Sequence, residues 1–275
     1  MVGKDSLRHE GTERSMRDTS FGGISASFER DIYASTKGYV RLGVLWEDLS
    51  AAIPEVRRGG LSVLDAGGGA GHITLLLARS GNKVVLYDPS QEMLDRADES
   101  VRRAGLSGSV TTVRSTIQDL EEQIDGRFDL VVCHAVLEWL ADPQEAVGHL
   151  VKFMKPRGGL LSLMFYNREA AFLKRVFRGE FAEALRERRD GFSPRGWGSG
   201  CTPLAEEEVR GWLEGLGLKV RSKAGIRIFH DHLPSGTLDD QQRLEDLLKV
   251  EKGLRGQEPF ASLGQHIHLV CEKTG

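Results

Sequence analysis

After Leu61, the chain alternates short apolar runs with amphipathic segments. The amphipathic segments carry apolar residues at helix-like intervals, whereas each apolar run has the length of a strand. These runs predict five strands, at Leu61–Asp65, Lys83–Tyr87, Val110–Arg114, Leu130–His134 and Gly159–Phe165. Strands and helices in alternation predict crossover connections. The expected fold is therefore α/β, with a mostly parallel sheet that helices cover on both faces.

The segments outside this core follow other patterns. Residues 1–20 are polar and aperiodic and are predicted to be a flexible tail, before helices near Ser25–Tyr33 and over Thr36–Ile53. Residues 168–203 interrupt the alternation and predict an insertion or lid. The sheet pattern resumes with a helix, a strand, a helix and a last strand, at Leu204–Leu216, Leu218–Phe229, Asp239–Leu254 and His266–Glu272. We expect residues 21–275 to form one domain.

Composition narrows the class of protein. The 275 residues are 40% hydrophobic and 28% charged, with a net charge of −3, which is typical of a globular protein. No apolar stretch is long enough to span a membrane, and the N-terminus lacks the apolar core of a secretory signal. Cys133, Cys201 and Cys271 lie far apart, which argues against a disulfide framework and against a metal site. We therefore expect a cytoplasmic protein without a metal.

The predicted insertion differs from the rest of the chain in charge. Residues 168–195 contain eight basic and five acidic side chains, a local surplus of three positive charges in a chain that is negative overall. Such a surplus favours an anionic partner at this segment.

The main candidate for a binding site is a glycine-rich turn in residues 63–71, Val-Leu-Asp-Ala-Gly-Gly-Gly-Ala-Gly. Glycine lets the backbone turn sharply and lets a ligand approach closely. Dinucleotide-binding oxidoreductases also have a glycine-rich turn after a strand. Here Asp65 precedes the first glycine, where its carboxylate would repel a pyrophosphate but suits an ammonium group. The pattern resembles the first motif of class I S-adenosylmethionine-dependent methyltransferases and favours them over dinucleotide-binding proteins.

Polar residues also follow the next three strands. Asp88 either accepts hydrogen bonds from ribose hydroxyls or is a helix cap or turn residue before Pro89-Ser90. Gln118 either lies beside an adenine, as the equivalent residue does in methyltransferases of this class, or belongs to the start of a short helix. His134, at the end of the fourth strand, is either a cofactor contact or a structural histidine.

Longer strings are similar to one particular family. They are FERDIY (28–33), TKG (36–38), HAVLEW (134–139), LMFYN (163–167), GIRIFHD (225–231) and QEPF (257–260). In order and spacing, from about Phe21 to Lys273, they resemble the bacterial tRNA 5-carboxymethoxyuridine methyltransferases. The MFYN and FHD strings are rare in methyltransferases at large, so the resemblance is specific.

The resemblance implies a Rossmann-like class I methyltransferase fold with seven strands, the last antiparallel. It implies methyl transfer from S-adenosylmethionine to the carboxylate of 5-carboxymethoxyuridine in the anticodon loop of tRNA, at the wobble position, to give a methyl ester. The implied cofactor contacts, together with the acid of the glycine-turn motif, are Arg41, Asp65, Gly67, Gly68, Asp88, Ile117, Gln118 and His134. The family usually has a small residue where Ile117 stands, so a backbone contact is expected there.

The implied reaction needs little chemistry from the protein. A carboxylate is already ionised at neutral pH, so no catalytic acid or base is expected. A buried carboxylate does need a cation or hydrogen-bond donors beside it. The candidates for this substrate contact are Tyr33, Lys37, Tyr166, Arg195, Arg227 and His230. Trp197 is either a stacking partner for the base or part of the packing of the lid.

Two other functions fit parts of the pattern. A class I methyltransferase acting on a small metabolite would share every cofactor residue, but an arginine-rich insertion is not typical of a closed apolar pocket. A non-catalytic binding module would keep the fold, but the intact acids and glycines at Asp65, Gly67, Gly69 and Asp88 argue against it.

Overall fold

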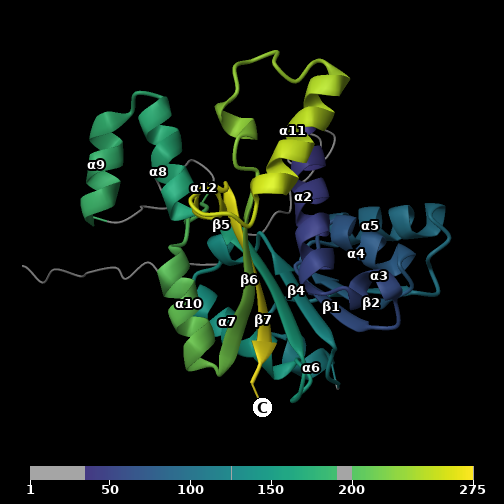
Figure 1. Ribbon diagram of the computed structural model, residues 1–275. Helices are drawn as coiled ribbons and strands as arrows, with labels where there is room; N and C mark the ends of the chain where they lie inside the picture. The colour runs from purple at the N-terminus through teal and green to yellow at the C-terminus, as the bar shows by residue number, and fades with distance from the viewer. Residues whose placement is uncertain (1–34, 125, 191–199, 275) are drawn as a thin grey trace, which may run out of the picture.

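The computed structural model describes residues 35–124, 126–190 and 200–274 (Figure 1). The predicted tail and the helix expected near Ser25–Tyr33 lie outside these residues. So do two of the candidate substrate contacts, Tyr33 and Arg195, and the candidate stacking residue Trp197.

A seven-stranded sheet runs through the molecule in the order β3-β2-β1-β4-β5-β7-β6. Its strands are β1 (Ser62–Ala66), β2 (Lys83–Asp88), β3 (Val110–Arg114), β4 (Leu130–His134), β5 (Leu160–Tyr166), β6 (Leu218–Ile226) and β7 (His266–Lys273). The first five strands pair in parallel, whereas β7 is antiparallel to both β5 and β6. The α/β fold expected from the sequence, including the antiparallel last strand, is confirmed.

Helices cover both faces of the sheet because side chains alternate along its buried strands. In β4, Leu130 and Val132 pack on one side, and Val131 and Cys133 on the other. The first side packs against α2 (Thr36–Ala52), α4 (His72–Arg79) and α11 (Gln241–Leu254), and the second against α7 (Pro143–Lys152) and α10 (Glu206–Gly215). The other helices before the end of β5 are α3 (Glu55–Arg58), α5 (Gln91–Arg103), α6 (Leu120–Gln123) and the 3-10 turn η1 (Leu137–Trp139).

Helix α2 forms where the sequence predicts a helix, because its apolar positions recur on one face. Val40, Val44 and Leu49 are fully buried on that face against the sheet. The same packing also buries two charged side chains of this helix, Arg41 and Asp48. Charged side chains are almost never fully buried without a partner. Arg41 and Asp48 are therefore expected to make specific contacts in addition to the packing of α2.

The described part of the predicted insertion folds as two helices, α8 (Arg168–Phe177) and α9 (Phe181–Asp190), which project from the body of the molecule (Figure 1). Arg175 of α8 joins them through a pair of contacts to Glu187 of 2.6 and 2.7 Å and a third to Glu180 of 2.6 Å. Three charges of the arginine-rich segment are thus used inside the hairpin. Because one positive and two negative charges pair there, the surplus counted along the sequence does not measure the charge that this segment presents to a partner.

Candidate cofactor and substrate cavity

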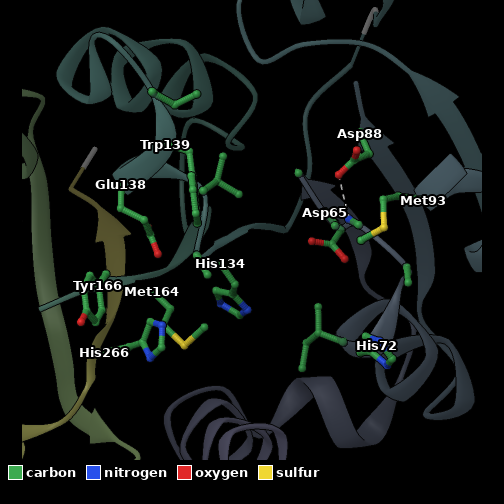
Figure 2. A pocket seen from close by; sticks show the side chains of 18 of the residues that line it. Asp65, His72, Asp88, Met93, His134, Glu138, Trp139, Met164, Tyr166 and His266 are labelled. Carbon is green, nitrogen blue, oxygen red and sulfur yellow. Dashed lines mark hydrogen bonds between the residues drawn. The ribbon is translucent and has the colours of Figure 1, made fainter. Parts of the chain in front are cut away.

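A cavity of about 590 Å³ lies at the carboxyl ends of the parallel strands. This is the edge of an open α/β sheet where ligands bind. Figure 2 shows Asp65, His72, Asp88 and Met93 along one side of it, and Glu138, Trp139, Tyr166 and His266 along the other. His134 lies between the two groups. The volume is within the usual range for a small-molecule site.

The glycine turn after β1 forms one wall of the cavity. Gly67 has a φ of 73°, and a Cβ there would lie 2.5 Å from Cγ2 of Val136. A Cβ at Gly68 would lie 2.7 Å from Oδ2 of Asp65. The turn is pinned because the backbone N–H groups of both glycines donate to the carbonyl of Tyr87, at 2.7 and 3.1 Å. Any side chain at either position would displace this wall.

Asp88 ends β2 with its carboxylate held in a fixed orientation. Its Oδ2 accepts from the N–H of Gly69 and its Oδ1 from the N–H of Ser90, both at 2.9 Å. The side chain that caps α5 is that of Ser90, which accepts from the N–H of Met93. Asp88 is therefore not the cap, although the sequence left this alternative open. Each carboxylate oxygen keeps lone-pair capacity for one more donor.

Asp65 lines the cavity from beneath the glycine turn and is 1% exposed. The hydroxyl of Thr74, in α4, donates to Oδ2 of Asp65 at 2.5 Å. Burial raises the pKa of Asp65 to about 7, and the charge of Asp88 acts in the same direction, against the effect of Thr74. The carboxyl group thus ties the turn to α4. It lines the cavity at the position where the glycine-turn motif predicts an acid.

The remaining candidate cofactor residues line the same cavity. Arg41 of α2 and His134 of β4 enter it from one side, and Ile117 and Gln118 enter it after β3. Burial holds the pKa of His134 well below its ordinary value, and the positive charge of Arg41 adds to this effect. The imidazole of His134 is therefore neutral at physiological pH.

The opposite end of the cavity is polar and is built from the last residue of β5 and the segments that follow it. Tyr166 and Arg227, two of the candidate substrate contacts, line it together with Lys174. The guanidinium of Arg227 donates to Asp231 through Nε at 2.9 Å and Nη2 at 2.5 Å. Burial works against ionisation of Asp231, but contacts with His230 and Arg227 hold its pKa below the usual range. A stable ion pair therefore fixes Arg227 in place.

The other two described candidates lie in a neighbouring hollow. Lys37 and His230 line it with Phe177 and Arg178, and Lys174 lines both the hollow and the cavity. His230 bonds to the hydroxyl of Thr36 at 2.9 Å, which fixes its ring beside the start of α2. The structure thus separates the candidates into two places that meet at Lys174.

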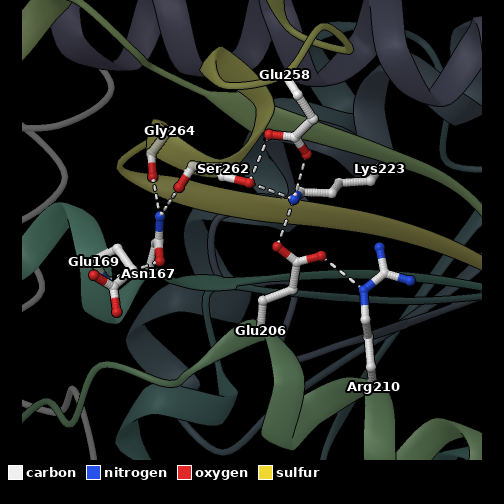
Figure 3. Close-up of polar contacts among 8 residues, drawn as sticks. All are labelled: Asn167, Glu169, Glu206, Arg210, Lys223, Glu258, Ser262 and Gly264. Atoms are coloured by element: carbon white, nitrogen blue, oxygen red, sulfur yellow. Dashed lines mark hydrogen bonds and ion pairs between the residues drawn. The ribbon is translucent and has the colours of Figure 1, made fainter.

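Asn167 links the start of α8 to the loop that enters the cavity before β7 (Figure 3). Its amide donates to the carbonyls of Ser262 and Gly264, both at 2.9 Å, and its Oδ1 accepts from the N–H of Glu169. Gly264 follows the short helix α12 (Phe260–Leu263), and Gln265 and His266 come next in the cavity lining. One buried side chain thus positions two segments of the site.

Lys223 holds the outer side of this loop. Its ammonium lies 2.7 Å from Glu258, 2.6 Å from Ser262 and 2.6 Å from Glu206, and Glu206 in turn accepts from Arg210 at 2.7 Å (Figure 3). The network ties α12 to α10, so the loop before β7 is supported from both sides.

Several lining residues were not singled out from the sequence. They are Glu138, Lys174, Gln265 and His266. Glu138 lies within the HAVLEW string, which signalled only a resemblance, and burial raises its pKa to about 7. Lys174 reaches the cavity through the packing of α8, which no local pattern reveals.

The described residues also bear on two other kinds of site. No helix within residues 35–124, 126–190 and 200–274 has the length and apolar character needed to cross a membrane. Within the same ranges, His, Cys, Asp and Glu side chains form no group of three or more that is placed to hold a metal ion.

The comparisons with known proteins agree with this geometry. The family model described as "Methyltransferase domain" matches residues 64–162. Magnesium protoporphyrin IX methyltransferase of Synechocystis PCC 6803, solved with bound SAH, superposes with a TM-score of 0.63 at 16% identity, over 92% of this chain and 96% of that one. An S-adenosylmethionine-dependent methyltransferase of Clostridium acetobutylicum gives 0.58 at 13% identity, over 93% and 99%. The chain is a methyltransferase with the class I fold, the class of enzymes that take their methyl group from S-adenosylmethionine.

One similarity extends well beyond this shared fold. The tRNA 5-carboxymethoxyuridine methyltransferase of Escherichia coli K12 is 36% identical over 264 residues, 94% of this chain and 97% of that protein. A ubiquinone biosynthesis O-methyltransferase of Methylococcus capsulatus is 27% identical over 168 residues, 61% and 67% of the two chains. The chain belongs to the tRNA 5-carboxymethoxyuridine methyltransferase family.

The residues of the cavity fit the cofactor. The glycine turn leaves room where side chains would fill it, and Asp88 keeps acceptor capacity on both oxygens. His134 has a buried ring nitrogen, Nδ1, with no hydrogen-bond partner among the described residues. A polar ligand at this place would satisfy these groups.

Proposed function

We propose that this enzyme methylates the carboxylate of 5-carboxymethoxyuridine at the wobble position of tRNA, giving the methyl ester. The observation that carries the proposal is the similarity to the Escherichia coli relative over nearly the whole of both chains. It includes the segments around the polar end of the cavity, where Arg227, Lys174 and Tyr166 lie. A substrate carboxylate needs cationic and hydroxyl donors of this kind.

The proposed reaction requires positioning rather than acid–base chemistry. S-adenosylmethionine supplies a methyl group on a positively charged sulfur. A carboxylate oxygen of the substrate forms the new bond to the methyl carbon as the carbon–sulfur bond breaks, and no proton is transferred. The protein must hold the carboxylate in line and exclude water, and good alignment contributes about 7–11 kcal/mol to lowering a barrier of this kind.

Arg227 is the residue we assign to the substrate carboxylate. Asp231 engages its Nε and Nη2, which leaves the Nη1 edge of the guanidinium for a second anion. The Asp231 pair also restrains the side chain, so little entropy is lost when a substrate binds. Arg227 has a φ of 62°, a strained conformation for a residue other than glycine that this contact would justify.

The hollow beside the cavity is the surface we assign to the tRNA. Lys37, Lys174 and Arg178 line it and supply cations for phosphates, and Phe177 is 68% exposed at its edge, where a base can stack. The wobble base belongs to a single-stranded loop, so no duplex has to open. The path from the hollow to the cavity passes Lys174, which lines both.

The same reasoning gives the organisation of the chain. We assign the described residues to one methyltransferase domain, within which helices α8 and α9 of the predicted insertion, residues 168–203, form a lid beside the cavity. The tail predicted over residues 1–20 lies outside the described residues. The support for the lid is Lys174, which α8 brings into the cavity lining. A tRNA substrate places the enzyme in the cytoplasm.

The test is methylation in vitro of tRNA that carries 5-carboxymethoxyuridine, 5-hydroxyuridine or unmodified uridine. We expect a methyl ester on the first substrate alone, detected by mass spectrometry of the nucleosides. Turnover of 5-hydroxyuridine at an equal rate would reject carboxyl methylation. Equal turnover of the free nucleoside and the tRNA would favour an enzyme for small molecules instead.

A matched pair of variants tests the contact to the carboxylate. Arg227→Lys keeps a positive charge for Asp231 but loses the second arm of the guanidinium. We expect at least a tenfold loss in kcat/KM on the tRNA, with the affinity for S-adenosylhomocysteine unchanged. Arg210→Lys is the control, because Arg210 pairs with Glu206 in the outer network. Equal activity of the two variants would remove Arg227 from the substrate site.

A further inference from the structure

Four side chains, three of them buried, form a line of hydrogen bonds from the cavity to helix α2. Nε2 of His134 lies 2.7 Å from Oγ of Ser162, which lies 2.8 Å from Nε2 of His268. Nδ1 of His268 lies 2.7 Å from Oδ2 of Asp48. We call these side chains the Ser162 network. It crosses β4, β5 and β7 on the face that packs against α2.

The charges at the inner end of this network are balanced without His268. Arg255 donates through Nε to Oδ1 of Asp48 at 3.1 Å, so the carboxylate already has a cationic partner. A second positive charge on His268, which is fully buried, would have no anion of its own. A single ring proton on His268 is the arrangement that leaves no unbalanced buried charge.

That single proton sets the direction of every bond in the Ser162 network. The carboxylate of Asp48 only accepts, so Nδ1 of His268 carries the proton and its Nε2 is an acceptor. The hydroxyl of Ser162 must then donate to His268, and its oxygen accepts from His134. Nε2 of His134 is therefore the protonated nitrogen of that ring.

The outer end of the network is left with a lone pair. Nδ1 of His134 is buried and has no hydrogen-bond partner among the described residues. It belongs to a residue that lines the cofactor cavity. A buried acceptor without a donor is costly, and this one is satisfied when a ligand supplies an N–H group.

We propose that Ser162, His268 and Asp48 are positioning residues that fix the tautomer of His134, so that its Nδ1 accepts a hydrogen bond from the ammonium group of the methionine part of the cofactor. The lone pair on Nδ1 would repel the carboxylate of the methionine part. The network therefore distinguishes the ammonium group of the cofactor from its carboxylate. The proposal rests on the S-adenosylmethionine cofactor and not on the tRNA substrate, so either can fail alone.

The first test uses the unaltered protein without ligand. Nitrogen-15 NMR of the histidine side chains distinguishes a protonated ring nitrogen from one with a lone pair. We expect His134 and His268 to be opposite tautomers, with the proton on Nε2 of His134 and on Nδ1 of His268. A proton on Nδ1 of His134 would overturn the proposal, whatever the behaviour of any variant.

The second test breaks the network with Ser162→Ala. We expect about tenfold weaker binding of S-adenosylhomocysteine by calorimetry, because the tautomer of His134 is no longer fixed. An analogue in which hydrogen replaces the amino group should bind the variant and the unaltered protein equally well. Ser222→Ala, the same change in β6, is the control and should alter neither affinity.

The two ligands separate positioning from general damage. Loss of affinity for both ligands by the same factor would show that Ser162 is merely structural and would overturn the proposal. A mixture of His134 tautomers in the variant, with selective loss for the ligand that has the amino group, would support it.

Discussion

Asp88→Asn is the substitution whose effect follows most directly from the site. The two carboxylate oxygens of Asp88 accept from the backbone N–H groups of Gly69 and Ser90, both at 2.9 Å. An amide has only one acceptor atom. In either orientation its NH₂ group therefore faces one of these two backbone donors, and the side chain loses its fixed orientation.

The size of the effect follows from the bonds that are lost. A ribose diol offers two hydroxyl donors to the ionised carboxylate, and a hydrogen bond to a charged group contributes about 1.5–3 kcal/mol. We expect the loss of one such bond, since the remaining amide oxygen keeps the other. The affinity for S-adenosylhomocysteine should then fall by roughly 10- to 150-fold.

Calorimetric titration of S-adenosylhomocysteine into the folded variant measures this change. Asp95→Asn is the matched control, because Asp95 is an exposed residue of α5 that bonds to Gln91. We expect the control to bind as the unaltered protein does. An Asp88→Asn protein that is folded and binds within threefold of the control would refute the ribose contact and leave Asp88 a residue of the turn.

Two further predictions concern stability. Burial raises the pKa of Asp65 to about 7 from 3.8, so the stability that the protonated form contributes is fully present below pH 3.8 and is lost as the pH rises through 7. Asp65→Asn should flatten this part of the profile of denaturant unfolding against pH, and an unchanged slope would contradict it. Glu187→Gln leaves Arg175 without its main buried partner and should lower the free energy of opening of α9 by about 3 kcal/mol. Amide hydrogen exchange in α9 measures this opening, and unaltered protection there would contradict the prediction.

The sequence predicts the fold and the site residues at the glycine turn and the strand ends. Both depend on the order of strands, turns and helices along the chain. A strand, a turn and a helix in succession place Asp65, Gly67 and Gly68 at the carboxyl edge of a parallel sheet, whatever the rest of the chain does. The same rule places Asp88 and His134 at that edge. The structure finds all five residues in the lining of one cavity.

The polar end of the cavity depends on tertiary packing and is harder to predict. Lys174 and His266 enter the cavity from a predicted insertion and a predicted strand, and nothing in the local pattern of either points to the site. Lys37 and His230, which were grouped with the substrate contacts, lie in the neighbouring hollow instead. Arg175 was counted as part of a basic surface, but it is buried against Glu187. Charge counted along a sequence does not reveal which charges pair.

The cavity is lined both by the segment that matches the methyltransferase domain and by elements outside it. The matched segment, 64–162, contains the glycine turn and Asp88, which any enzyme of this class needs for its cofactor. Arg41, Lys174 and Arg227 line the same cavity from outside that segment. Helix α2 contributes twice, because Arg41 faces the cavity and Asp48, two turns later, anchors the network that ends at His134. In the roles proposed above, the choice of acceptor and the orientation of the cofactor depend on the same added elements, and a change that shifts α2 should disturb both.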